Sequence, residues 1–143
     1  MVDRVLLAED LVDLREAYNQ SLEKAGFNVT AVEDGDELYS ALKKNRFEVI
    51  LSDSDMPLMN GHEACRKAIS DKILNDRETL IIGMSGDSDN QKYWRGLAHI
   101  GCFYDKDYFF PEKIGKIVSQ ALRNFRQGGL WQEIMPVFTN SGF

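Results

Sequence analysis

The sequence predicts an α/β protein built on a doubly wound parallel sheet with helices on both faces. Apolar runs of strand length alternate with segments of helical period from Arg4 to about Arg126, which is the pattern of repeated strand–helix units. The run Phe47–Asp53 is the most continuously apolar of them, as expected of a central strand buried on both faces. A chain of 143 residues, 43% of them hydrophobic, has the size of one ordinary globular domain.

The first part of the chain contains two strand–helix units. The apolar run Arg4–Asp10 predicts the first strand, and Val12–Ala25 predicts a helix because its apolar residues recur at three- and four-residue spacing. Asn28–Val32 alternates in hydrophobicity, which indicates a half-buried second strand. The following segment, "DGDELYSALKKN", predicts a second helix capped by either Asp34 or Asp36.

The middle of the chain continues the same alternation. Phe47–Asp53 is the predicted third strand, and a more weakly amphipathic helix is expected over about Gly61–Ile73. Thr79–Ser85 predicts the fourth strand, and a helix is expected over about Asn90–Ile100. Cys102–Lys106 predicts the fifth strand.

The last predicted helix ends the regular part of the chain. Pro111 stands where the first helical residue is expected, and an apolar stripe follows up to about Arg126. We therefore expect one domain over residues 1–126 and a C-terminal tail over 127–143. The tail is apolar and aromatic without clear periodicity; we interpret it as a terminus that folds back or frays, with a partner-docking or linker segment as the alternative.

Charge and composition exclude several classes of function. Seventeen basic and twenty-three acidic residues give a net charge of −6, without a Lys/Arg block, so a direct nucleic-acid partner is not expected. No apolar run is long enough to span a membrane, and we expect a cytoplasmic protein. Cys65 and Cys102 lack metal or redox spacing and are interpreted as small hydrophobic residues. His62 and His99 are isolated in the same way.

Polar side chains follow the predicted strands where the functional crevice of a parallel sheet lies. Glu9 and Asp10 follow the first strand, Asp53 the third, Ser85 the fourth and Lys106 the fifth. Each residue alone has an ordinary explanation as a helix cap, a turn former or a solvated charge. Their order at the ends of successive strands favours one shared site.

The chemistry of this set points to phosphoryl transfer. Carboxylates that lie within a few ångströms of one another repel unless a cation lies between them, and their hard oxygens suit Mg²⁺. A carboxylate such as Asp53 can attack phosphorus while a hydroxyl (Ser85) and an ammonium group (Lys106) neutralise the phosphoryl oxygens. The turn through Pro57 and Gly61 leaves the Asp53 carboxylate open.

With these residues the chain resembles the response-regulator receiver domains of two-component signalling, and in particular the single-domain, CheY-like ones. The acidic pair of that family matches Glu9 and Asp10, its phospho-accepting Asp matches Asp53, and its "D-x-x-M-P-x-M-x-G" signature matches Asp53–Gly61 without a gap. The resemblance covers Arg4 to about Arg126 and implies a flavodoxin-like (βα)5 fold with strand order 2-1-3-4-5.

The resemblance also implies roles for individual residues. Asp53 would be phosphorylated, with Mg²⁺ held by Glu9, Asp10, Asp53 and the main-chain carbonyl of Asp55. Ser85 matches the family's switch hydroxyl, Lys106 its lysine, and Phe103 its switch aromatic residue.

The same resemblance implies partners rather than an enzymatic output. A histidine kinase or phosphotransfer protein would supply the phosphoryl group, and a downstream partner protein or a phosphorylation-dependent dimer would provide the response. The protein would be a signalling switch in a phosphorelay, which at most catalyses its own phosphorylation and dephosphorylation.

The chain departs from the family pattern at several positions. Asp107 stands where the family usually has a Pro after the Lys, Gly86 replaces a usual Ala, and Phe103 lacks the hydroxyl of the commoner Tyr. Asp55 and Asp87 occupy positions that tune hydrolysis in the family. We expect the acidic Asp55 to shorten the lifetime of the phosphoryl group.

Two other functions fit parts of the sequence. A degenerate receiver would bind partners without phosphorylation, and the Asp107 departure keeps this alternative open. A haloacid-dehalogenase-like phosphatase would use a D-x-D pair such as Asp53 and Asp55. In that family, however, the metal-binding acids come last in the chain, whereas Glu9 and Asp10 come first here.

Overall fold

The computed structural model describes residues 2–86, 90–95, 97, 101–105 and 111–128, and for residues 91, 95 and 101–105 it describes the backbone alone. In chain order the elements are β1 (Arg4–Ala8), α1 (Val12–Lys24), β2 (Asn28–Val32), α2 (Gly35–Lys44), β3 (Val49–Asp53), α3 (Gly61–Ser70), β4 (Leu80–Ser85), α4 (Gln91–Arg95), β5 (Gly101–Asp105), a 3₁₀ turn η2 (Pro111–Lys113) and α5 (Ile114–Arg126).

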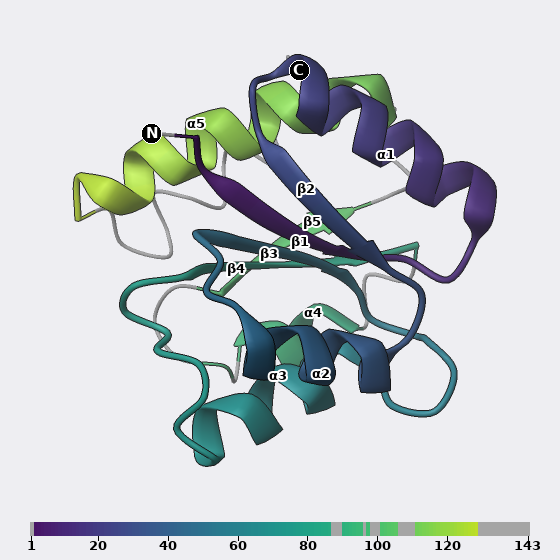
Figure 1. The fold of residues 1–143 in the computed structure, drawn as a ribbon, viewed down its shortest axis with the longest axis vertical. Coiled ribbons are helices and arrows are strands. Elements are labelled where there is room, and N and C mark those ends of the chain that lie inside the picture. Colours follow the sequence, from purple (N-terminus) through teal and green to yellow (C-terminus); the bar gives the residue numbers. More distant parts are fainter. Residues whose placement is uncertain (1, 87–89, 96, 98–100, 106–110, 129–143) are drawn as a thin grey trace.

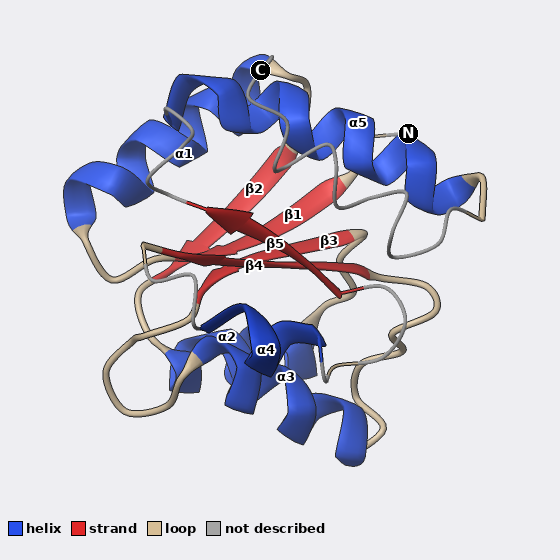
Figure 2. Ribbon diagram, turned by 180° about the vertical axis from the view of Figure 1, so that it is seen from behind, coloured by secondary structure: helices blue, strands red, loops and turns tan. Residues whose placement is uncertain are grey.

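The strands form one parallel sheet in the order β2-β1-β3-β4-β5. Helices α1 and α5 cover one face of the sheet, and α2, α3 and α4 cover the other (Figures 1 and 2). This is the doubly wound, flavodoxin-like architecture expected from the sequence, with the expected strand order. Among the described residues, no helix is both long and apolar enough to cross a bilayer.

Strand β3 is the centre of the sheet, as its apolar composition predicts. All five of its residues are buried. In the parallel registers Val49 lies beside Val5 of β1 on one side and beside Leu80 of β4 on the other. Because helices cover both faces at this point, side chains pointing either way enter the core.

Strand β2 forms one edge of the sheet and is less regular than its sequence suggests. Its partly buried side chains, Val29 and Val32, lie three residues apart, and the residues between them are exposed. The half-burial is therefore confirmed but the strict alternation is wrong. An edge strand has a neighbour on one side only, so its side chains are less uniformly covered.

The amino-terminal cap of α2 is Asp34. Its carboxylate accepts the N–H of Glu37 at 2.8 Å, and the Glu37 carboxylate accepts the N–H of Glu33 at 3.2 Å. The first bond is a side-chain N-cap, and in the second the Glu37 side chain binds back to the residue before the cap. Of the two caps that the sequence left open, Asp36 is not the one used.

The last helix begins later than expected. Pro111 opens the 3₁₀ turn η2, and α5 starts at Ile114. The reason lies on α1, where the Ser21 hydroxyl donates to the carbonyl of Glu112 and accepts the N–H of Gly115, both at 2.9 Å. The apolar stripe of α5 is buried as predicted.

Other element ends differ by a few residues. Strand β1 ends at Ala8, so that Glu9 and Asp10 follow it instead of ending it. Helix α3 ends at Ser70 instead of Ile73, because Lys72 has a φ of 60° and turns the chain out of the helix. The later part of the fourth predicted helix (96 and 98–100) and the tail (129–143) lie outside the described residues.

Candidate functional site

Three carboxylates come together where β1 and β3 end. Ala8 of β1 lies beside Ser52 of β3, so the residues after β1 come next to Asp53. One carboxylate oxygen each from Glu9, Asp10 and Asp53 lies within 4.8 Å of the other two. The structure thus brings together the three carboxylates that the sequence places at strand ends. Three hard oxygen donors in this arrangement are able to hold a divalent cation such as Mg²⁺.

Backbone amides hold two of these carboxylates in place. The N–H of Leu11 donates to Oε2 of Glu9 at 3.3 Å, and the N–H of Ser54 donates to Oδ1 of Asp53 at 2.9 Å. Glu9 and Asp53 are buried, whereas Asp10 is half-buried. The cluster is therefore anchored on its inner side and reachable from solvent beside Asp10.

The negative charge of this cluster affects the pKa of a buried tyrosine. Tyr18 of α1 is only 1% exposed. Burial raises the pKa of its phenol, and the negative charges of Glu9 and Asp53 raise that pKa further. The phenol stays neutral, so Tyr18 adds no further negative charge to the cluster.

Asn90 joins two other residues of the predicted site. Its Nδ2 group donates to the Ser85 hydroxyl at 2.9 Å and to Oδ2 of Asp55 at 3.0 Å. Ser85, at the end of β4, is 2% exposed, while Asp55 is exposed. Sequence reasoning placed Asn90 at the start of a helix but gave it no role in the site.

Trp94 and Ser54 are also near the site and were missed. The indole N–H of Trp94 donates to the Ser54 hydroxyl at 2.6 Å, and Ser54 directly follows Asp53. One sequence signal was available, because Gly83 interrupts the apolar strand "LIIGMS". A glycine inside a buried strand often marks the close approach of another group, and here the Trp94 ring lies against it.

The turn after β3 depends on a second glycine. A Cβ at position 61 would overlap the Asp53 carbonyl oxygen and the Ser52 hydroxyl. The N–H of Gly61 donates to the carbonyl of Ser54 at 3.1 Å. Gly61 therefore lets α3 begin directly against the end of β3 that carries Asp53. Leu58, in the turn between β3 and α3, is 79% exposed with a φ of 70°.

Several predicted site residues cannot be placed. Lys106, Asp87 and Asp107 lie outside the described residues. Phe103 lies in β5, but its side chain is also outside the described part of the structure. Their roles stay predictions.

A second group of acids on the surface has a structural explanation. Oxygens of Glu33, Asp34 and Glu37 also lie within 4.8 Å of one another. These residues make the two hydrogen bonds at the amino-terminal end of α2, and Glu33 and Glu37 are exposed. The cap hydrogen bonds account for the carboxylates of Asp34 and Glu37, and the Glu33 carboxylate pairs with Arg15 at 3.9 Å, so this group is not a candidate site.

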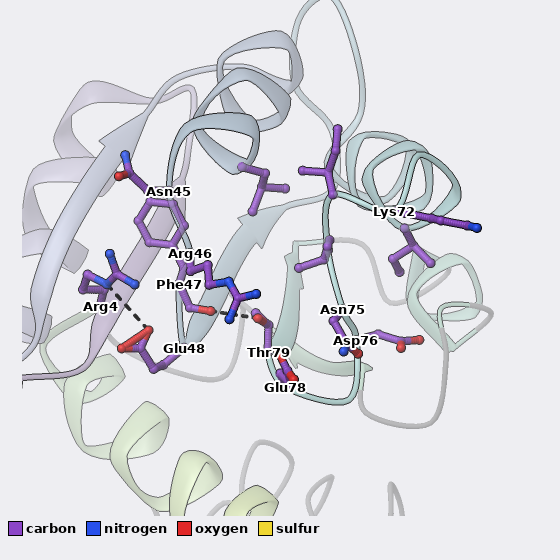
Figure 3. A pocket seen from close by; sticks show the side chains of 14 residues that line it. Arg4, Asn45, Arg46, Phe47, Glu48, Lys72, Asn75, Asp76, Glu78 and Thr79 are labelled. Carbon is purple, nitrogen blue, oxygen red and sulfur yellow. Dashed lines mark hydrogen bonds and ion pairs between the residues drawn. The ribbon is translucent and has the colours of Figure 1, made fainter.

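A groove of about 650 Å³ lies at the opposite, amino-terminal end of the strands (Figure 3). Side chains of both charges line it, and Arg4 is paired with Glu48 at 3.7 Å. The Thr79 hydroxyl donates to the carbonyl of Phe47 at 2.8 Å. The groove therefore lacks the single-sign charge and convergent donors of a built ligand site.

Cys65 behaves as the sequence predicts. It is a free, fully buried residue of α3, and burial raises the pKa of its thiol to about 12. A thiol with so high a pKa is a poor nucleophile and metal ligand. It packs as a small apolar residue.

Comparison with known proteins agrees with this arrangement. A family model described as the response regulator receiver domain matches residues 5–103. The response regulator receiver protein CpdR of Brucella abortus is 43% identical over 65 residues, which are 46% of this chain and 54% of CpdR. The regulatory protein VanRB of Enterococcus faecalis is 31% identical over 88 residues, which are 62% of this chain and 39% of VanRB. The matches span about half, or less, of these relatives.

Solved structures show the same fold over most of the chain. The chemotaxis response regulator CheY4 of Vibrio cholerae superposes with a TM-score of 0.73 at 25% identity, covering 84% of this chain and 98% of CheY4. A CheY-like receiver domain protein from Methanospirillum hungatei gives a TM-score of 0.75 at 19% identity, covering 90% of this chain and all of that one. At 19% identity the second likeness concerns the fold alone.

Proposed function

The chain belongs to the response regulator receiver domain family, and on that premise we propose that it is a phospho-accepting switch with Asp53 as the acceptor. The observation that supports this most directly is the meeting of three carboxylates, Glu9, Asp10 and Asp53, at the carboxyl ends of β1 and β3. A structural cap or turn does not require three carboxylates from two strands to lie so close together.

The donor set fits a magnesium ion. The carboxylates of Glu9, Asp10 and Asp53 and the main-chain carbonyl of Asp55 are the groups that would hold it, and all of them are hard oxygen ligands. When bound, the ion supplies positive charge that neutralises phosphoryl oxygens.

The covalent step takes place at Asp53, and neighbouring side chains assist it. A carboxylate oxygen of Asp53 attacks the phosphorus of a phosphohistidine on a histidine kinase or phosphotransfer protein. The O–P bond forms as the P–N bond breaks, and the donor imidazole leaves with the bonding electron pair. The Ser85 hydroxyl and the Lys106 ammonium group stabilise the phosphoryl oxygens by hydrogen bonding.

The new charge is the signal. A phosphoryl group at Asp53 draws the Ser85 hydroxyl toward it, and Phe103 packs into the space that is vacated. This changes the surface that a downstream partner protein, or a second copy of the chain, binds. The protein acts in the cytoplasm, and its phosphoryl group is hydrolysed with help from Asp55.

Intact-mass spectrometry of the whole chain tests the proposal. The protein is incubated with acetyl phosphate or phosphoramidate and Mg²⁺, beside Asp53→Asn, a chelated sample and the matched control Asp36→Asn, which removes an exposed carboxylate from α2. We expect one phosphoryl adduct on the parent and on Asp36→Asn, and none on Asp53→Asn or after chelation.

Two other results would contradict the proposal in different ways. An adduct that persists in Asp53→Asn would assign the acceptor to another residue. If the parent forms no adduct and also fails to bind beryllofluoride, the chain is a degenerate receiver that binds its partners without phosphorylation.

A further inference from the structure

Helix α4 is fastened to the sheet by a buried tryptophan. Trp94 is fully buried, and its ring lies against Gly83 of β4, where a Cβ would overlap the ring atoms. The ring also makes an edge-to-face contact with the His62 ring of α3, with centroids 6.1 Å apart. This packing fixes the position of the indole N–H.

The indole N–H of Trp94 forms a hydrogen bond to Ser54. The Ser54 hydroxyl accepts it at 2.6 Å and donates to the carbonyl of Met84 at 2.8 Å. The Ser54 residue is wholly buried, so no water reaches the hydroxyl to replace either partner. A buried hydroxyl with both kinds of hydrogen bond satisfied has one preferred orientation.

Ser54 in turn orients the acceptor. Its backbone N–H is shared between the carbonyl of Met84 at 2.8 Å and Oδ1 of Asp53 at 2.9 Å, and the Ser54 hydroxyl donates to the same Met84 carbonyl, so the bond from Trp94 acts on the group that competes with Asp53 for this N–H. Trp94 therefore reaches the acidic cluster through one intervening residue. Four positions earlier in the chain, Asn90 donates to Ser85 and Asp55, so the start of α4 is tied to the ends of both β3 and β4.

We propose that Trp94 is a positioning residue for Asp53: its indole N–H, acting through Ser54, holds the Asp53 carboxylate in the orientation that binds Mg²⁺ and accepts a phosphoryl group. The inference rests on the function proposed above. Because coupling between two sites is reciprocal, occupation of the Asp53 site also strengthens the hold on α4.

The variant Trp94→Phe separates this role from packing, because it keeps an aromatic ring against Gly83 and removes the N–H. The net energy of one buried hydrogen bond limits the expected loss to about tenfold, so we expect a measurable weakening of Mg²⁺ affinity of up to about tenfold, measured by titration calorimetry with Mg²⁺ alone. The matched control is Tyr39→Phe, which removes another aromatic donor, bonded at 2.6 Å to Asp71 between α2 and α3. The control should bind Mg²⁺ like the parent.

A second comparison shows whether the effect passes through Ser54. In a Ser54→Ala background the N–H of Trp94 has lost its acceptor, so Trp94→Phe should no longer weaken Mg²⁺ binding. A further loss of affinity in the double variant would mean that the ring acts by packing and would overturn the proposal.

Nuclear magnetic resonance gives a readout of the bond itself. The chain has two tryptophans, so it shows two indole N–H signals, and Trp94→Phe identifies the one from Trp94. We expect this signal to shift on addition of Mg²⁺ and again on addition of beryllofluoride, and to shift less in Ser54→Ala.

The outcomes distinguish this inference from the proposed function. A parent that binds Mg²⁺ and accepts a phosphoryl group, with identical behaviour in Trp94→Phe and a stationary Trp94 signal, overturns the positioning role alone. A parent that binds neither Mg²⁺ nor beryllofluoride overturns both proposals.

Discussion

The contact between Gly83 and Trp94 predicts that a single methyl group will destabilise the protein. In Gly83→Ala the new Cβ would overlap the indole ring, which is fully buried and cannot move into solvent. Overpacking of this kind costs about 1–3 kcal/mol, while replacing Gly by Ala returns about 0.4–1 kcal/mol by restricting the unfolded chain. We expect a net loss of about 1–2 kcal/mol in the free energy of unfolding.

The test is a double-mutant cycle with Trp94→Leu. Leucine is smaller than the indole and leaves room for the methyl group, so Gly83→Ala should become neutral or slightly stabilising in that background. Urea unfolding followed by far-ultraviolet circular dichroism gives the free energies without relying on tryptophan fluorescence. If Gly83→Ala costs the same with either residue at position 94, the reasoning about this contact is refuted.

Three further predictions concern a cap, a buried phenol and the site. Asp34→Ala should lower the free energy of unfolding by about 1 kcal/mol through loss of the α2 cap, with Asp36→Ala nearly neutral in the same urea experiment. The raised pKa of Tyr18 means that the folded chain holds this proton more firmly than the unfolded chain. The contribution of this proton to the free energy of unfolding is complete below about pH 10 and is lost as the pH rises further. In Tyr18→Phe the free energy of unfolding should therefore fall less steeply at alkaline pH. An unchanged dependence of the free energy of unfolding on pH would contradict this. Asp55→Ala should lengthen the half-life of the phosphoryl group on Asp53, measured by intact mass after donor removal, whereas an unchanged half-life would remove Asp55 from hydrolysis.

The sequence was sufficient to predict the sheet and the residues at its strand ends. A continuously apolar strand such as β3 has a clear physical cause, because both of its faces are covered. Once the strands are parallel, the carboxyl ends lie at one edge, and the meeting of Glu9, Asp10 and Asp53 follows from topology.

The contacts that sequence reasoning missed join residues far apart in the chain. Trp94 and Ser54 are 40 positions apart, and nothing in the local pattern of either residue indicates the other. The late start of α5 has the same cause, because it depends on Ser21, 94 residues before Gly115. The local helix propensity predicts that the helix starts at Pro111, and hydrogen bonds to the distant Ser21 side chain shift the start to a later residue.

Strand β3 and helix α4 are held by different kinds of interaction, and this predicts two rates of amide exchange around the site. β3 has hydrogen-bonded neighbours on both sides and is entirely buried, so its amides exchange only when the whole domain unfolds. Helix α4 is joined to the sheet by side chains such as Trp94 and Asn90, and a local opening that breaks those few contacts exposes its amides. Asp53 therefore lies on a strand that stays closed when α4 opens, and an opening that breaks the Trp94–Ser54 bond releases the orientation of the acceptor carboxylate while the strand that carries it stays folded.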